Sequence, residues 1–166
     1  EPTIKGLVKD NLPYQGFVFF GLINTSKGPK VIEYNVRMGD PETEVVIPRL
    51  ESDLVDLFVA MHEGTLDEVD LQVNPQTATT VMVVAGGYPE AYKKGDVISG
   101  LRDFKATTVY HAGTKGTDEV VTNGGRVMAF TSFGADKDEA LAKSYASIAE
   151  VSFEGMNFRK DIGFDL

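Results

Sequence analysis

Residues 30–42 read KVIEYNVRMGDPE, and this stretch decides the fold of the first half of the chain. Its side chains alternate between apolar residues at positions 32, 34 and 36 and polar residues at positions 33, 35 and 37. Because strand side chains point alternately to the two sides, the pattern predicts a strand over Lys30–Arg37 with one apolar and one polar face. The apolar run Gly16–Ile23 predicts a buried strand that pairs with it as a hairpin.

Helices are expected after this hairpin. Asp40 is expected to cap the first of them, with Pro41 at the first helical position and Glu42 in the first turn, where an acid compensates the helix dipole. Pro48 should break that helix, and apolar residues at helical spacing then predict a second one that ends at Gly64.

Beyond about residue 76 the apolar pattern changes from a helical period to a period of two, which predicts short strands separated by glycine-rich turns. The expected strands are Thr79–Ala85, Val97–Leu101, Thr107–Ala112, Glu119–Thr122, Arg126–Phe133 and Val151–Phe153. Asp136 and Glu139 form a capping box for one helix before the last strand. The sequence therefore predicts an α+β fold with two domains, residues 1–70 and an antiparallel β domain with one helix over residues 76–166.

Composition excludes several classes of protein. The 166 residues include 16 basic and 25 acidic side chains, a net charge of −9, and no cysteine. A net acidic chain is a poor partner for nucleic acid, and the longest apolar run is too short to cross a membrane. Without cysteine there is no thiol nucleophile, so any catalysis must use carboxylates, Arg, Lys, His or a hard metal ion, and a reducing compartment is expected.

The polar face of the second strand is the best candidate for chemistry. Residues two apart on a strand lie roughly 6.5 Å apart along one face, so Glu33 and Asn35 can reach one cation. Carboxylate and amide oxygens suit Mg²⁺, and Arg37 follows in the same row as a positive fork for a phosphoryl group. The alternative is a polar face that meets only solvent.

Beyond this spacing, several segments resemble the glycinamide ribonucleotide synthetase (phosphoribosylamine-glycine ligase) family. The signature is the run from Arg37 to Val45, followed by Pro48 to Leu54. Five later segments resemble that family's C-terminal part, in order: Gly86–Pro89, Lys94–Ile98, His111–Thr114, Val121–Val127 and Arg159–Gly163. The resemblance covers essentially the whole chain.

The resemblance implies that the chain is the C-terminal half of an ATP-grasp ligase. Residues 1–70 would be the C-terminal portion of the ATP-grasp domain, a β-hairpin plus helices, and residues 76–166 the C-terminal domain. It implies a cytoplasmic enzyme of purine biosynthesis that joins glycine to phosphoribosylamine, with ATP as co-substrate and Mg²⁺ or Mn²⁺ as metal. The missing N-terminal half would be its partner, the isolated chain would be inactive, and neither nucleic acid nor membrane would bind.

The family likeness also implies roles for individual residues. Glu33 and Asn35 would ligate the metal, with Arg37 as the catalytic cation. Either these two ligands suffice, or another comes from the rest of the ligase. Biotin-dependent carboxylases carry a similar row, so another ATP-grasp ligase or carboxylase, or a non-catalytic module derived from one, is the alternative.

Three further residues are candidates for binding substrate. Asp40 could hold an ammonium or amine, or act only as a helix cap. Glu42 could contact substrate or only compensate the dipole. Arg126, after the turn Asn123–Gly125, could bind the ribose phosphate or lie in solvent as a hairpin arginine.

Overall fold

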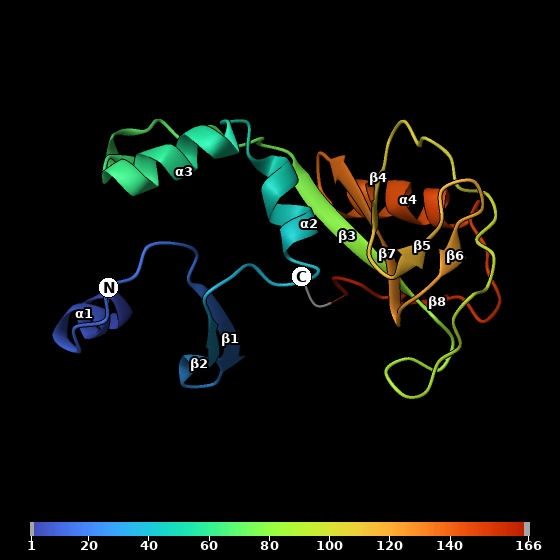
Figure 1. The fold of residues 1–166 in the computed structure, drawn as a ribbon, viewed down its shortest axis with the longest axis horizontal. Helices are drawn as coiled ribbons and strands as arrows, with labels where there is room; N and C mark the ends of the chain where they lie inside the picture. The colour runs from blue at the N-terminus through green and yellow to red at the C-terminus, as the bar shows by residue number, and fades with distance from the viewer. Residues whose placement is uncertain (1, 165–166) are drawn as a thin grey trace. The chain divides into compact units, whose positions relative to one another are not determined.

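The computed structural model describes residues 2–164, which form two compact units (Figure 1). The first contains residues 2–42 and 50–73, and the second contains residues 43–49 and 74–164. Both mix helices with antiparallel strands, so the predicted α+β class is confirmed.

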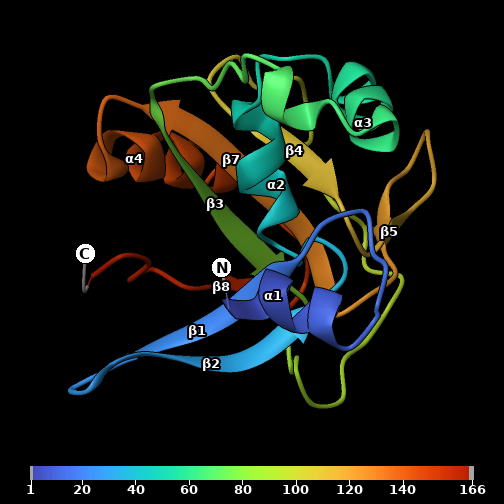
Figure 2. The same ribbon diagram turned by 90° about the vertical axis from the view of Figure 1, so that its left-hand side faces the viewer.

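The first unit contains a two-stranded antiparallel hairpin (Figure 2). It consists of β1 (Phe19–Thr25) and β2 (Gly28–Asn35), joined by a short turn in which the Thr25 hydroxyl donates to the Gly28 carbonyl at 2.7 Å. The register places Gly21 opposite Glu33 and then Leu22 opposite Val31. Residue 32 is skipped, so a β-bulge interrupts the predicted alternation next to Glu33.

The prediction that Gly16–Ile23 forms a buried strand is wrong. The strand begins at Phe19, and its apolar side chains are largely exposed, with Leu22 at 56%. Ile32 on the partner strand is 66% exposed. A two-stranded hairpin has no interior of its own, so apolar residues on its strands are buried only where another element covers them.

Helices complete the first unit. These are α1 (Pro2–Lys9), α3 (Leu54–Glu63) and the 3₁₀ turn η2 (Leu66–Glu68). Asp53 caps α3 by accepting hydrogen bonds from two backbone N–H groups, and Gly64 ends the helix with a left-handed φ of 76°. The predicted stop at Gly64 is therefore confirmed.

The helix expected at Asp40 begins later. Residues 40–42 form a turn in which the Asp40–Pro41 peptide is cis, and α2 (Thr43–Val46) starts only at Thr43. Asp40 is therefore not its cap, because it precedes the first helical residue by three positions. Pro48 does end the α-helix, since the chain continues as the 3₁₀ turn η1 (Ile47–Arg49).

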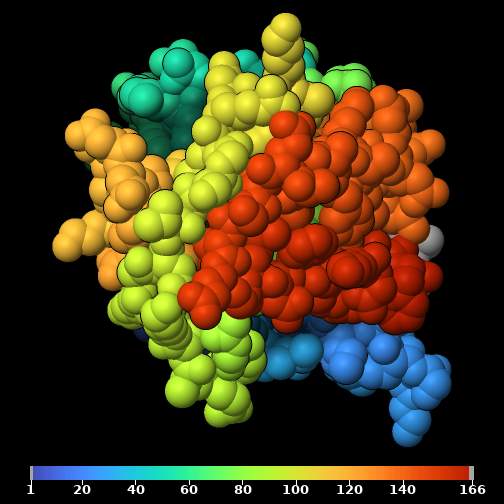
Figure 3. All heavy atoms as spheres, turned by 90° about the vertical axis from the view of Figure 1, so that its right-hand side faces the viewer, coloured from blue at the N-terminus to red at the C-terminus, as the bar shows by residue number. Residues whose placement is uncertain are grey.

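The second unit is built on a four-stranded antiparallel sheet with the order β4-β7-β3-β8. Its strands are β3 (Thr77–Val84), β4 (Thr108–His111), β7 (Arg126–Gly134) and β8 (Asn157–Phe158), and a separate pair joins β5 (Thr114–Lys115) to β6 (Val121–Thr122). Helix α4 (Lys137–Ile148) packs on β3 and β7 (Figure 1). Figure 3 shows the face on which the C-terminal segments of this unit gather.

The core of the second unit lies between the sheet and α4. The largest fully buried apolar side chains are Val81, Val83, Val127, Met128, Phe130 and Ile148. The strands expected over Val97–Leu101 and Val151–Phe153 do not form as such. Instead, isolated β-bridges pair Val97 with Val121 and Ser99 with Ser152. Gly100, with a φ of 83°, ends the first of these stretches, and the final strand forms instead at β8.

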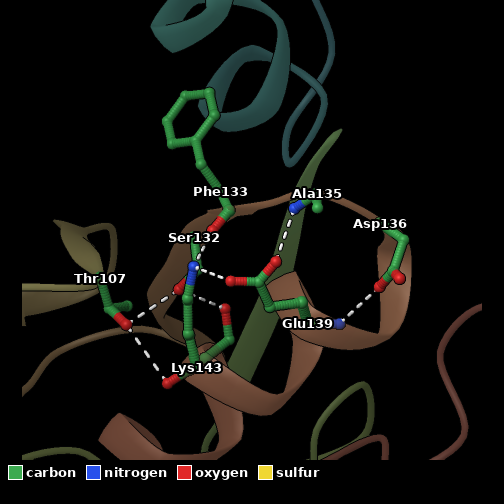
Figure 4. A network of polar contacts seen from close by, with 8 residues as sticks. Thr107, Ser132, Phe133, Ala135, Asp136, Glu139 and Lys143 are labelled. Carbon is green, nitrogen blue, oxygen red and sulfur yellow. Dashed lines mark hydrogen bonds and ion pairs between the residues drawn. The ribbon is translucent and has the colours of Figure 1, made fainter. Parts of the chain in front are cut away.

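A polar network fixes the start of α4 (Figure 4). The Asp136 carboxylate accepts from the Glu139 N–H at 2.8 Å, which confirms Asp136 as the cap. The Glu139 carboxylate accepts from the Ala135 N–H at 2.7 Å, one residue before the Asp136 N–H that a capping box would use. Lys143 pairs with Glu139 at 2.7 Å and donates to the Phe133 carbonyl. The hydrogen bond from Lys143, followed by the one from the Ala135 N–H, holds the pKa of Glu139 below its usual value.

No helix within residues 2–164 has the length and apolar character needed to span a bilayer.

Candidate metal and phosphate site

Glu33 and Asn35 lie side by side on one face of β2. The Asn35 amide Nδ2 donates a hydrogen bond to Glu33 Oε1 at 3.0 Å. Glu33 is exposed and Asn35 is half-buried, so a ligand can reach both from solvent. Two residues apart on one strand, they meet as the spacing requires.

The distance between these two side chains fits a magnesium ion. In an octahedral shell with Mg–O distances of about 2.1 Å, neighbouring oxygens lie about 3.0 Å apart. The Asn35 Nδ2 atom lies 3.0 Å from Glu33 Oε1, and turning the amide over puts Oδ1 in nearly the same place. The pair can therefore present one carboxylate and one amide oxygen to a single hard cation.

Among residues 2–164, no three His, Asp or Glu side chains gather where they could hold a metal ion. A cation held by Glu33 and Asn35 alone would have most of its octahedral shell filled by water and phosphate oxygens.

Gly21 lies directly across the hairpin from Glu33. A Cβ atom built on Gly21 would lie 2.8 Å from Glu33 Cγ, 3.6 Å from Oε1 and 3.7 Å from Cδ. The Glu33 side chain thus occupies the space that any other residue at position 21 would fill. Gly21 was not singled out from the sequence, although glycine inside a strand is a known signal of close approach.

Arg37 lies just beyond the strand. The strand was predicted to extend to Arg37 but ends at Asn35, and residues 36–37 form a bend. The exposed Arg37 guanidinium donates to the Met38 carbonyl at 3.2 Å. Strand geometry therefore does not place Arg37 in one row with Glu33 and Asn35. The Arg37 guanidinium contacts the loop that follows the strand, at the Met38 carbonyl.

That loop also carries Asp40 and Glu42, both exposed. The Glu42 carboxylate folds back onto the buried Gly39, so that a Cβ at position 39 would lie 2.8 Å from Glu42 Cδ. The loop residues 37–42 thus present one guanidinium and two carboxylates after the end of β2.

Arg126 belongs to the second unit, whereas the other candidates belong to the first. It is the first residue of β7, where it pairs with Val84, and its carbonyl accepts from the Gly113 N–H at 2.9 Å. The adjacent Gly125 lies beneath the rings of Tyr88 and Tyr92, whose centroids are 6.1 Å apart.

Comparison with known proteins places this geometry in a family. The C domain of phosphoribosylglycinamide synthetase matches residues 78–165, and the ATP-grasp (A) domain of the same enzyme matches residues 1–43. The chain belongs to the phosphoribosylglycinamide synthetase family. Glu33 to Glu42 fall within the part that matches the family's ATP-grasp domain, and Arg126 falls within the part that matches its C domain.

Relatives of this synthetase family cover nearly all of the chain. A phosphoribosylamine-glycine ligase of Vibrio parahaemolyticus is 46% identical over 98% of the chain, and a bifunctional purine biosynthetic protein of Pichia angusta is 48% identical over 98%. The crystal structure of a Thermotoga maritima phosphoribosylamine-glycine ligase superposes with a TM-score of 0.79 at 34% identity, covering 96% of the chain. The chain spans 39%, 21% and 40% of the lengths of these three proteins, respectively.

Proposed function

We propose that the chain is the C-terminal part of an ATP-dependent phosphoribosylamine-glycine ligase acting in purine biosynthesis. The observation that carries the proposal is that Glu33 and Asn35, a carboxylate and an amide that could hold Mg²⁺ or Mn²⁺, meet on β2 within the segment similar to an ATP-grasp domain. Residues 1–70 would be the C-terminal portion of the ATP-grasp domain and residues 76–166 the C-terminal domain. The partners would be ATP, glycine, phosphoribosylamine and the N-terminal part of the ligase, in the cytoplasm.

The reaction has two steps. A carboxylate oxygen of glycine attacks the γ-phosphorus of ATP, the bond to the β-phosphate oxygen breaks, and ADP leaves with the bonding pair. The amine nitrogen of phosphoribosylamine then attacks the acyl carbon, the carbon–oxygen bond to phosphate breaks, and the nitrogen loses a proton. The products are glycinamide ribonucleotide, ADP and phosphate.

The chain's own residues contribute mainly charge in this scheme. A bound divalent ion would neutralise phosphate oxygens, and Glu33 with Asn35 would hold it. Arg37 would offer its planar fork to the transferring phosphoryl group or to the acyl phosphate. Such fixed charges stabilise a phosphoryl-transfer transition state without a covalent enzyme intermediate, which agrees with a chain that has no cysteine.

Three residues are proposed to bind substrate. Asp40 does not cap α2, which begins at Thr43. Its carboxylate would hold the ammonium of glycine or the incoming amine, and the Glu42 carboxylate would contact the same substrate. Arg126 would bind the ribose phosphate, because the glycines before it let backbone approach an anion and arginine binds phosphate with two N–H groups.

Glu33→Ala in a full-length ligase that carries this chain tests the proposal. Removing a main electrostatic stabiliser should lower turnover with glycine and phosphoribosylamine at least about a hundredfold. Glu63→Ala, an exposed acid at the end of α3, is the matched control and should leave turnover unchanged. Near-normal turnover of Glu33→Ala at saturating Mg²⁺ would contradict the assignment.

A further inference from the structure

We infer that Gly21 is a positioning residue, which leaves the space across the hairpin that the Glu33 side chain needs in order to meet Asn35. The inference deepens the proposed function and rests on it, because it concerns how the chain prepares the two side chains for a divalent ion. Gly21 itself touches neither metal nor substrate.

The register of the hairpin places the two residues face to face. Gly21 on β1 is the direct partner of Glu33 on β2, so their side chains would share one face of the sheet. A Cβ atom added to Gly21 would lie 2.8 Å from Glu33 Cγ. Real side chains do not approach so closely, so any other residue at position 21 must push Glu33 aside.

This crowding falls near the base of the Glu33 side chain. The atom that a new Cβ would meet is Cγ, one bond from the Glu33 Cβ, and not the flexible carboxylate end. A change of rotamer at Glu33 would therefore swing the whole carboxylate away from Asn35. The bulge directly after Gly21 fixes this part of the register, so the strands cannot relieve the contact by a simple slip.

The backbone itself does not require glycine at position 21. The positive-φ glycines of the chain do not include Gly21, so alanine can adopt its backbone conformation. Alanine is also favoured over glycine inside a strand, because glycine loses more conformational freedom on folding. A positioning role therefore predicts that Gly21→Ala damages the metal site in a protein that still folds.

The test uses a full-length ligase that carries this chain and measures Mn²⁺ binding by electron paramagnetic resonance, without nucleotide. Gly21→Ala should raise the Mn²⁺ dissociation constant about 10- to 100-fold, the range found when residues that orient metal ligands are changed. Its thermal melting should remain a cooperative transition, which shows that the variant is folded when binding is measured. Gly6→Ala is the control, since Gly6 also has an ordinary φ and its added Cβ would meet no side chain within 4 Å and no backbone outside its own helix.

A double-mutant cycle separates the two proposals. Glu33→Ala removes Cγ, so Gly21→Ala should have no further effect on Mn²⁺ binding in that background. If Glu33→Ala alone leaves Mn²⁺ binding unchanged, the proposed function fails. If Glu33→Ala weakens binding and Gly21→Ala does not, only the role of Gly21 is overturned. It is also overturned if the effect of Gly21→Ala on Mn²⁺ binding persists in the Glu33→Ala background.

Discussion

The buried Gly39 leaves space for the Glu42 carboxylate in the loop after β2, as Gly21 leaves space for Glu33. Gly39→Ala therefore tests whether Glu42 binds substrate. The new Cβ would lie 2.8 Å from Glu42 Cδ and closer still to one carboxylate oxygen. Ordinary contact begins at 3.4 Å, so the carboxylate carbon must move by at least the difference, about 0.6 Å. Only the end of a flexible side chain moves, and we expect little change in folding stability.

The effect on activity should be larger than the effect on stability. Misplacing a group that positions substrate by about 1 Å can cost about a hundredfold in rate. If Glu42 binds substrate, Gly39→Ala in a full-length ligase should lower kcat/KM for glycine or phosphoribosylamine about ten- to a hundredfold.

The assay is steady-state kinetics with each of the two substrates varied in turn, accompanied by thermal melting of every variant. Glu42→Ala supplies the background that decides the cause, because there the added methyl group has no carboxylate to displace. Unchanged kcat/KM in Gly39→Ala would refute the role of Glu42. An equal loss in the Glu42→Ala background would show that the loop backbone, and not Glu42, is responsible.

Two further predictions concern the pH dependence of folding and the activity of the isolated chain. The folded pKa of Glu139 is lowered, so its contribution to stability is present above its ordinary pKa of 4.5 and is lost as pH falls through the folded value. Urea unfolding at several pH values should show that the free energy of unfolding of the chain falls on acidification. Glu139→Gln should make this free energy depend less steeply on pH, and an identical pH dependence would contradict the ion pair's role. The isolated chain should show no ligase activity and at most weak heats with MgATP in calorimetry, whereas micromolar affinity would place the nucleotide site on this chain.

Local signals in the sequence predicted those parts of the structure that depend on neighbours along the chain. The pairing of Glu33 with Asn35 follows from the two-residue spacing of a strand. The Asp136 cap and the stop at Gly64 follow from short-range chemistry between a side chain or a left-handed backbone and the ends of a helix.

Features that depend on distant partners could not be predicted in this way. The apolar run Gly16–Ile23 indicates a strand, but periodicity does not say what covers it, and Leu22 is exposed. The role of Gly21 depends on the cross-strand register and on the bulge beside it, neither of which is encoded by a single strand. The helix expected at Asp40 begins at Thr43 because residues 40–42 form a turn, although their composition is typical of a helix start.

The central claim is that Glu33 and Asn35 hold one divalent cation. The most direct test is anomalous scattering from Mn²⁺ in crystals of a full-length ligase that carries this chain, grown with a non-hydrolysable ATP analogue. We expect one anomalous peak about 2.1 Å from a Glu33 carboxylate oxygen and from Asn35 Oδ1, in contact with phosphate oxygens. Mn²⁺ bound to the nucleotide with neither side chain in its shell would contradict the account.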